Sequence, residues 1–445
     1  MKKKGLITVL SLINIIFLVA LSGLLIYAIN INRKEANEKA NQTQDMVQDN
    51  TEQSSQADKE AETRDKENDP NENLEPSGSP DKSSETNNQG NPDGSNKEVS
   101  GSDQEDESQE EDENQEEDEN KDEGNESNPI VLAFAGDINF NEESKPMARY
   151  DSEKKGILGG ISAELVEEMK EANIMMLNNE FAYSTRGTKA PNKSYTFRAH
   201  PKRVNILHEM GVDIVSLANN HTLDYGQEAL EDTFTTLEEA GIDYVGAGRN
   251  IDQAKAPIYY TIGDTTIAYL AASRVIFAMD WYATQTRPGM IGTYDPTLLL
   301  SSIEEAKKNS DYVVVYVHWG VERNHYPEDY QKNFAKKYID AGADIVIGCH
   351  PHVMQGLEFY KGKPIAYSLG NYWFNASTNY SGLLKIYINT DQSLQVQLLP
   401  AAYKNTYTYR ITDENERKNY YKFMEDISFD VTIDENGYVT EKTQE

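Results

Sequence analysis

Histidine is scarce in this chain, yet two of the seven histidines stand one residue apart in the stretch ADIVIGCHPHV. His350 and His352 follow a run of small and apolar residues that is typical of a buried strand. Other apolar runs also end in polar groups, and the full set is Asp137, Glu180, Asn219, Asn220, His221, His318, His350 and His352. Carboxylates, amide oxygens and neutral imidazoles together are suitable ligands for divalent Zn, Mn or Fe. The first chemistry to consider is therefore metal binding.

The segments that carry these residues predict an α/β fold. IVLAFAGD, HEMGVDIVSLANNH and KKNSDYVVVYVHWG each place an apolar run before a polar end, and two of them begin with the end of a helical pattern. Continuous apolar runs between helical patterns are typical of buried strands, and we expect helices at 227–240 and 329–341 to cover the sheet. Open α/β sheets bind ligands beyond the carboxyl ends of their strands, so the polar ends should converge on one crevice.

Each polar strand end also has an ordinary structural explanation when taken alone. An aspartate after glycine can form a turn, an asparagine can cap a helix, and a histidine can be hydrogen-bonded within the core. The same position at the end of five apolar runs favours a shared metal site over five unrelated explanations.

Five motifs give the chain a resemblance to a known family. FAGD, ANNHTLDYG, HWG, GADIVIGCHPHVMQG and YSLGN occur in this order between residues 130 and 371. As a set they resemble the CapA family of capsule-synthesis proteins, which is linked to poly-γ-glutamate biosynthesis and similar to calcineurin-like metallophosphoesterases. The resemblance implies a metallophosphatase-like layered β-sheet core, flanked by helices, over residues 129–400. We expect residues 401–445 to add a C-terminal helix and a hairpin.

The resemblance also implies a role for each polar strand end and two bound divalent ions, Mn, Zn or Fe. The first ion would be held by Asp137 and His352, the second by Asn220, His318 and His350, and Glu180 would bridge them. His221 takes the place of the phosphoesterase histidine that contacts the substrate and protonates a leaving group, with Asp224 as its partner. Asn139 stands where phosphoesterases usually have a histidine, which leaves the first ion with fewer ligands.

Basic residues near the strand ends are candidates for substrate binding. Lys193 and Arg198 lie in NKSYTFRAHP, and Arg323 lies in RNHYPEDY. A basic loop beside a metal site suits a carboxylate or phosphate, so these three are the predicted substrate-binding residues. The alternation of Tyr195 and Phe197 fits a structural strand equally well.

Cys349, the single cysteine, immediately precedes His350. Because successive residues of a strand point to opposite faces, a His350 that faces the crevice would send Cys349 into the core. We expect core packing for Cys349.

The first 128 residues differ sharply in composition from the rest. Residues 5–29 hold no charge and, at about 1.5 Å per residue, can cross a bilayer core roughly 30 Å thick. Residues 1–30 therefore predict a single-pass transmembrane anchor rather than a cleaved signal peptide. Residues 31–128 hold 32 acidic against 9 basic residues and no Phe, Trp or Tyr, which predicts a disordered, extended acidic linker. Three lysines before the anchor favour a cytoplasmic N-terminus and an extracellular folded part.

Together these features predict a protein of the cell membrane that assists biosynthesis or export of a capsule polymer. The expected partners are the membrane, an anionic polymer such as poly-γ-glutamate, and membrane synthase subunits. The alternative is a metal-dependent phosphoesterase-type hydrolase of a cell-envelope substrate, and a third possibility is a binding module whose site has lost catalysis. Nucleic acid is disfavoured as a partner, since the residues from 129 onward include 43 acidic against 30 basic ones.

Overall fold

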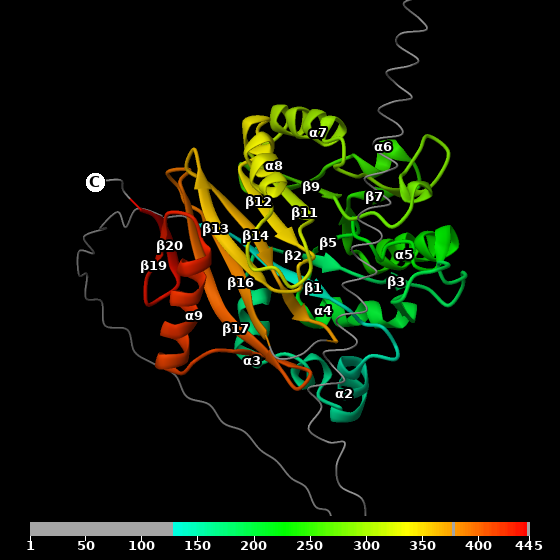
Figure 1. The fold of residues 1–445 in the computed structure, drawn as a ribbon, viewed down its shortest axis with the longest axis horizontal. Helices are drawn as coiled ribbons and strands as arrows, with labels where there is room; N and C mark the ends of the chain where they lie inside the picture. Colours follow the sequence, from blue (N-terminus) through cyan, green and yellow to red (C-terminus); the bar gives the residue numbers. More distant parts are fainter. Residues whose placement is uncertain (1–127, 376–378, 443–445) are drawn as a thin grey trace, which may run out of the picture. The chain divides into compact units, whose positions relative to one another are not determined.

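The computed structural model describes residues 128–375 and 379–442 (Figure 1). The predicted anchor, residues 1–30, and all of the predicted acidic linker except residue 128 lie outside these ranges. Within the described ranges, no helix combines the length and the apolar character needed to cross a bilayer.

The strands of the described residues form two large mixed sheets. The first runs in the order β19 (Val431–Ile433), β20 (Tyr438–Glu441), β17 (Leu394–Lys404), β16 (Asn379–Ile388), β1 (Ile130–Ile138), β2 (Ile174–Asn179), β5 (Ile214–Ser216) and β6 (Asp243–Val245), with β15 (Asn371–Trp373) beside β1 and β18 (Tyr407–Arg410) beside β17. The second runs in the order β13 (Met354–Tyr360), β14 (Lys363–Leu369), β12 (Ile345–Cys349), β11 (Tyr312–His318), β9 (Thr265–Ser273) and β8 (Ile258–Ile262). Two short pairs join β3 (Ala182–Tyr183) to β4 (Arg198–Ala199) and β7 (Ala247–Gly248) to β10 (Gly289–Met290).

Each large sheet has a parallel centre. β1, β2, β5 and β6 are parallel neighbours in the first sheet, and β9, β11, β12 and β14 are parallel neighbours in the second. The carboxyl ends of a parallel group lie along one edge of its sheet, and ligand sites of α/β proteins form at that edge.

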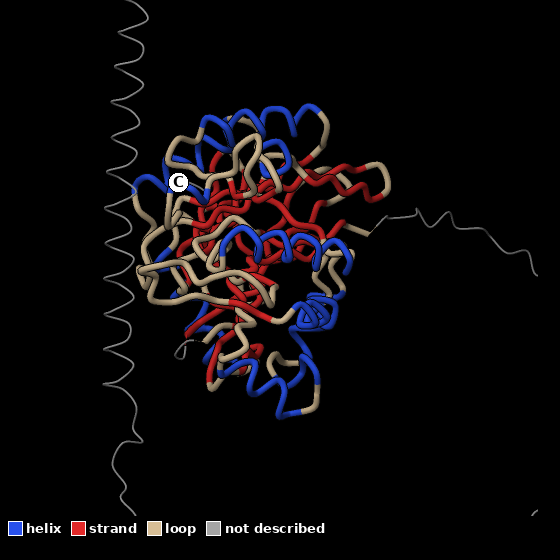
Figure 2. Tube along the Cα trace, turned by 90° about the vertical axis from the view of Figure 1, so that its right-hand side faces the viewer, coloured by secondary structure: helices blue, strands red, loops and turns tan. Residues whose placement is uncertain are grey.

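Because side chains alternate along each strand, each sheet has one face toward the other sheet and one face toward the helices. Leu132 and Phe134 of β1 share an apolar cluster with Val314 of β11, so one face of each sheet packs against the other. Ala133 of β1 packs on the opposite side with the first group of helices, and Val315 of β11 packs with the second group. The molecule therefore has helices outside and two sheets inside, as Figure 2 shows.

The helices cover the two outer faces. On the first sheet lie α2 (Lys145–Glu153), α3 (Ala163–Lys170), α4 (Asn205–Met210) and α5 (Gly226–Ala240), with the short 3-10 turns Gly156–Gly159 and Pro201–Val204. On the second lie α6 (Ile251–Ala254), α7 (Thr297–Lys308) and α8 (Asp329–Asp340); another 3-10 turn spans Met279–Trp281. The helices predicted at 227–240 and 329–341 are confirmed as α5 and α8 within one residue at each end.

The C-terminal elements belong to the same folded body. α9 (Glu414–Ile427) contributes Tyr420 and Met424 to the cluster between the sheets, and the antiparallel hairpin of β19 and β20 extends the first sheet beside β17. The helix and the hairpin expected from the sequence are thus present, while the boundary at residue 400 stays a prediction.

The two sheets meet closely at the end of β1. A Cβ on Gly136 would lie only 1.8 Å from the carbonyl oxygen of Gly370, which follows β14. The next residue, Asp137, donates its backbone N–H to that same oxygen at 2.9 Å. Only glycine permits this approach, and it fixes Asp137 between the sheets.

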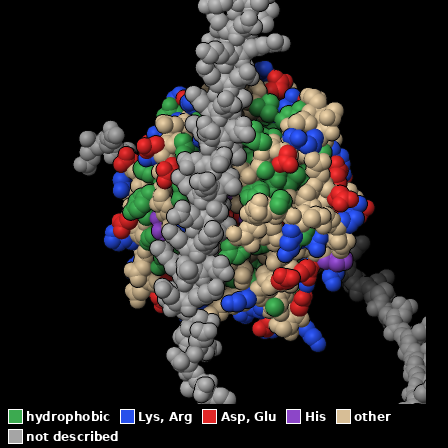
Figure 3. Space-filling view, turned by 45° about the vertical axis from the view of Figure 1, so that its right-hand side comes forward, with side chains coloured by type: hydrophobic (Ala, Val, Ile, Leu, Met, Phe, Trp, Pro, Cys, Tyr) green, Lys and Arg blue, Asp and Glu red, His purple; other side chains and the backbone are tan. Residues whose placement is uncertain are grey.

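Charged side chains of both signs lie among one another on the face shown in Figure 3. This mixture agrees with the sequence composition, which disfavours the basic stripe that nucleic-acid binding requires.

Candidate metal centre

The residues predicted as ligands lie where the parallel strands of both sheets end. Asp137 is the penultimate residue of β1, Glu180 follows β2, Asn220 and His221 lie in the loop after β5, His318 ends β11, and His350 and His352 follow β12. Asp137, Glu180 and His318 are completely buried, and His350, Asn220 and His221 are at most 5% exposed. The structure therefore brings the whole predicted set together in one region that is buried except for the partly exposed His352, while the role of each residue stays a proposal.

One group consists of Asp137, Glu180 and His352. Each residue offers an atom that could bind an ion, and these atoms lie within 4.8 Å of one another. His352 Nδ1 lies 3.4 Å from Asp137 Oδ2, and His352 Nε2 lies 3.8 Å from Glu180 Oε1. The imidazole of His352 thus lies between the two carboxylates.

A second group contains His318, Asn220 and His350. His318 Nε2 lies 2.9 Å from Asn220 Oδ1, and the rings of His318 and His350 have centroids 4.6 Å apart. The backbone N–H of His350 donates to Asp137 Oδ2 at 3.2 Å, so the second group adjoins the first.

Asn178, which is not among the predicted site residues, holds the carboxylates in place. Its Nδ2 donates to Asp137 Oδ1 at 2.8 Å and to Glu180 Oε2 at 3.2 Å, while its Oδ1 accepts from Asn219 Nδ2 at 3.1 Å. A signal was present in the motif MMLNNE, because two asparagines at the end of an apolar strand need polar partners.

The turn that carries the paired histidines has an unusual backbone. His350 has φ 99° and His352 has φ 58°, both in the region that favours glycine. Such conformations cost about 1–3 kcal/mol each and persist where the surroundings enforce them, often at functional sites. Here the first positive φ ends the regular alternation of β12 and turns His350 back toward the space between the sheets.

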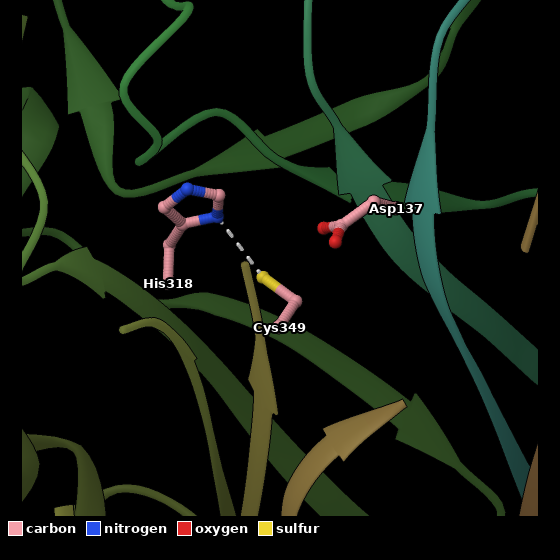
Figure 4. A group of neighbouring side chains, drawn as sticks. All are labelled: Asp137, His318 and Cys349. Carbon is pink, nitrogen blue, oxygen red and sulfur yellow. Dashed lines mark hydrogen bonds between the residues drawn. The ribbon is translucent and has the colours of Figure 1, made fainter. Parts of the chain in front are cut away.

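The prediction that Cys349 faces away from the crevice is wrong, although its burial in the core is confirmed. Cys349 pairs with His318 in the register of β11 and β12, so both side chains point toward the other sheet. Figure 4 shows the thiol, His318 and Asp137 turned toward one another, with Sγ 3.2 Å from His318 Nδ1. Burial raises the pKa of the Cys349 thiol, which keeps it protonated.

The charges of the first group depend on one another. Burial on its own lowers the pKa of His352, but the charge of Glu180 and the hydrogen bond and charge of Asp137 outweigh it and raise that pKa to about 10. Burial likewise opposes ionisation of Asp137, yet its contacts with His352 and Asn178 hold its pKa below the ordinary value. Burial, followed by the nearby charge of Asp137, raises the pKa of Glu180.

The other histidines of the site are held neutral. Burial is the main cause in each case; it lowers the pKa of His350 to about 3 and that of His221 to about 4, and it lowers the pKa of His318 as well. A neutral imidazole has a free lone pair, which is the form that binds a metal ion.

Two buried atoms of the site have no hydrogen-bond partner, namely Glu180 Oε1 and His350 Nδ1. Buried polar atoms are almost always paired, and an ion bound between these two groups would supply the partner that each lacks. Carboxylate oxygens, an amide oxygen and imidazole nitrogens also form the donor set that divalent transition metals prefer. The residues present therefore fit the ions that the sequence predicts.

His221 is held in place by its neighbours at the edge of the site. Its Nδ1 lies 2.6 Å from Asp224 Oδ2, its Nε2 lies 3.8 Å from Glu180 Oε1, and its ring stacks on Phe197 at 4.1 Å. The pairing of His221 with Asp224 is thus present in the structure.

Of the three basic residues predicted to bind substrate, Lys193 lies deepest. Its side chain is 6% exposed and Nζ lies 2.5 Å from Asp224 Oδ1. Arg198 stacks its guanidinium over Tyr225 at 4.1 Å and donates to the carbonyl oxygen of Arg186. Arg323 is exposed, and its backbone N–H donates to the carbonyl oxygen of Pro351 at 2.8 Å.

Comparison with known proteins supports the resemblance seen in the motifs. Residues 131–376 match the family described as bacterial capsule synthesis protein PGA_cap. The capsule biosynthesis protein CapA of Bacillus anthracis is 36% identical over 216 residues, which cover 47% of this chain and 52% of that protein. The PGA biosynthesis protein CapA of Bacillus subtilis is 35% identical, with 48% and 56% covered. The chain thus spans about half the length of these relatives.

Solved structures resemble the chain only distantly. The NAD nucleotidase of Haemophilus influenzae has 9% sequence identity and a TM-score of 0.38, with 68% of this chain and 63% of that chain covered. This TM-score is too low to assign a fold or a chemistry from the likeness.

Proposed function

The chain belongs to the bacterial capsule synthesis protein family PGA_cap, and we propose from this premise that it assists the synthesis or export of an anionic capsule polymer such as poly-γ-glutamate. The observation that carries the proposal is the buried cluster at the strand ends, with its unpaired Glu180 Oε1 and His350 Nδ1. We propose that this cluster holds two divalent ions. The polymer and the ions are matched in chemistry, because carboxylates are good ligands for divalent cations.

The proposed ligands are Asp137, Glu180 and His352 for one ion and Asn220, His318 and His350 for the other. Ions bound there supply positive charge for a carboxylate or phosphate and polarise its oxygen atoms. Asn178 keeps the two carboxylates aligned through its amide. The neutral imidazoles of His318 and His350 need not lose a proton before binding, whereas His352, whose pKa is raised to about 10, must give one up.

A second candidate function is hydrolysis of a phosphoester in the cell envelope. It is favoured by the 2.6 Å contact between His221 and Asp224, which holds the ring so that Nε2 is directed toward Glu180. Phe197 covers the face of that ring and limits the access of water. Because burial keeps the free imidazole neutral, His221 would first take up a proton and then pass it to a leaving group bound beside the ions, the role of a general acid.

We also propose a location and partners for the protein. The uncharged segment at residues 5–29 supports a single-pass anchor in the cell membrane, and the lysines before it support an extracellular folded part. The acidic composition of residues 31–128 supports a spacer between the two, and membrane synthase subunits are the proposed protein partners.

Metal content and turnover test the proposal together. The full-length protein, purified in detergent, should hold close to two transition-metal ions per chain by elemental analysis. His350→Ala should lose most of this metal, whereas His208→Ala, at an exposed position of α4, should keep it. Absence of metal from the wild type, or full metal content in His350→Ala, would contradict the proposed centre.

Turnover of a chromogenic phosphodiester separates the two functions. Hydrolysis that His221→Ala abolishes while the metal stays bound would establish the hydrolase. Bound metal without turnover, with polymer output of cells preserved in His221→Ala, would favour the role in capsule assembly.

A further inference from the structure

A third carboxylate faces the candidate metal centre, and neither the motifs nor the assigned roles include it. Glu322 lies in the loop between β11 and α8, four residues after His318. Its carboxylate and the imidazoles of His350 and His352 offer atoms that lie within 4.8 Å of one another. His352 also belongs to the group of Asp137 and Glu180, so Glu322 lies at the same centre.

The backbone holds this loop against the turn that carries the histidines. Arg323, with φ 61°, donates its N–H to the carbonyl oxygen of Pro351 at 2.8 Å. Gly320 has φ 99°, and a Cβ there would lie 2.9 Å from the ring of Pro351. The backbone N–H of Gly320 donates to the hydroxyl oxygen of Tyr330 at 2.7 Å. Contacts on both sides of Glu322 therefore fix its position beside His350 and His352.

The unpaired nitrogen of His350 also points to a ligand at this place. His350 is 3% exposed, and its Nδ1 has no hydrogen-bond partner. Such an atom has lost its contact with water, and an ion bound between His350 and Glu322 restores a partner to it.

Asn139 does not supply an oxygen ligand to the ion of Asp137 and His352. This residue follows Asp137 by two positions and is 1% exposed. Its Oδ1 accepts the backbone N–H of Asn141 at 2.8 Å, so its oxygen is engaged in its own turn. Glu322 is a carboxylate from a different segment that lies in range of His350 and His352.

We propose that Glu322 is a metal ligand of this centre, acting together with His350 and His352. The proposal rests on the metal centre put forward under the proposed function and adds one ligand to it. Asp137 and Glu180 are completely buried, whereas Glu322 is half-buried, so Glu322 is the carboxylate ligand on the solvent side.

Manganese binding tests the role of Glu322 without any assay of activity. The full-length protein is stripped with a chelator and titrated with Mn²⁺, with the bound ions counted by electron paramagnetic resonance and the affinity measured by calorimetry. Glu322→Gln keeps the shape of the side chain but removes its charge. We expect it to weaken the binding of one ion by at least about tenfold, the lower end of losses for residues that support a metal.

The matched control is Asp329→Asn, which removes an exposed carboxylate at the start of α8 that pairs with Lys332 at 2.8 Å. It should bind Mn²⁺ like the wild type. Glu322→Asp, which keeps the charge on a shorter side chain, should bind with an affinity between those of the wild type and Glu322→Gln.

Three outcomes separate this proposal from the centre on which it rests. Two ions in the wild type with equal affinity in Glu322→Gln would overturn the role of Glu322 and leave the centre standing. No binding by the wild type would remove the centre and this ligand together. Equal unfolding midpoints of the metal-free wild type and Glu322→Gln, with the expected loss of affinity, assign the loss to ligation.

Discussion

Two clusters of ion pairs each hold one basic side chain, Lys193 in the first and Arg203 in the second. The two clusters differ in how far their carboxylates are exposed to water. In the first, Lys193 Nζ lies 2.5 Å from Asp224 Oδ1 and 3.0 Å from His221 Nδ1, and the side chains of Lys193 and Asp224 are 6% and 0% exposed. In the second, Arg203 pairs with Glu142 at 2.9 Å and with Asp151 at 2.5 Å, and these carboxylates are 39% and 55% exposed.

The Lys193 cluster cannot exchange its partners for water. The ammonium also binds the carbonyl oxygen of Asn220 at 2.5 Å and lies over the ring of Trp281 at 5.4 Å. Asp224 accepts from the backbone N–H of Phe197 at 2.7 Å, and its charge is otherwise balanced by Lys193. Every group in this cluster is thus committed to holding the loop of Asn220 and His221.

The Arg203 cluster joins surface segments. Arg203 donates two hydrogen bonds to each carboxylate and links the 3-10 turn at Pro201–Val204 to α2 and to the loop before it. The side chain of Arg203 is itself only 9% exposed, but both of its carboxylates are open to water, so this cluster should contribute less to stability than the first. The same kind of ion pair is therefore part of a functional site in one place and a surface contact in the other.

Lys193→Met should have the largest effect, because it leaves the charge of Asp224 buried without its cation. Removal of one partner of a buried pair costs about 3–5 kcal/mol, and the free energy of unfolding from urea titration should fall by this amount. The double variant Lys193→Met/Asp224→Asn, which removes both charges, should recover part of the loss. A fall below about 1 kcal/mol in the single variant would mean that the two clusters do not differ.

Arg203→Met should have a smaller effect under the same conditions. Its carboxylates regain water when the guanidinium is lost, so the free energy of unfolding should fall by about 1 kcal/mol, as is usual for exposed pairs. A loss as large as that of Lys193→Met would show that exposure of the partners does not decide the strength of the pair.

The pH dependence of the Arg203 cluster should be the smallest effect. The hydrogen bonds from Arg203 lower the pKa of Glu142 and of Asp151 from their ordinary values of 4.5 and 3.8. A carboxyl group with a lowered pKa stabilises the fold at pH values above its ordinary pKa. This contribution disappears as the pH falls through the lowered pKa. The difference between wild type and Arg203→Met, measured by urea titration, should shrink by a few tenths of a kcal/mol or more between pH 7 and pH 3. A difference that grows toward acid pH would contradict the sign.

The ends of the buried strands could be predicted because the signals for them lie in neighbouring residues of the sequence. An apolar run fixes a buried strand, and a polar residue at its end, such as Asp137 or His318, has only the strand edge to occupy. The pair of His221 and Asp224 was predictable from the resemblance of its motif. The helices and the C-terminal hairpin were predictable from periodicity and turn residues.

Other features depend on contacts between distant segments, which a single sequence does not reveal. The sequence around Lys193 indicates only a basic loop residue. The structure shows that the loop of Lys193 packs against the loop of Asp224, so that the two side chains form a buried ion pair. Cys349 was assigned to the wrong face because the rule of alternation stops at His350, whose φ is 99°. Glu322 lies in an ordinary polar loop, and its place beside His350 follows from contacts with Pro351.

The position of Cys349 has a practical consequence for experiments on motion. It is the only cysteine of the chain, it is completely buried, and its sulfur lies beside His318. Its side chain faces the other sheet, so a thiol reagent can reach it only when this part of the molecule opens, and the rate of labelling measures how often that happens. The natural protein thus carries a single built-in probe, and a comparison of labelling rates with and without divalent ions will report whether ions lock the two sheets together.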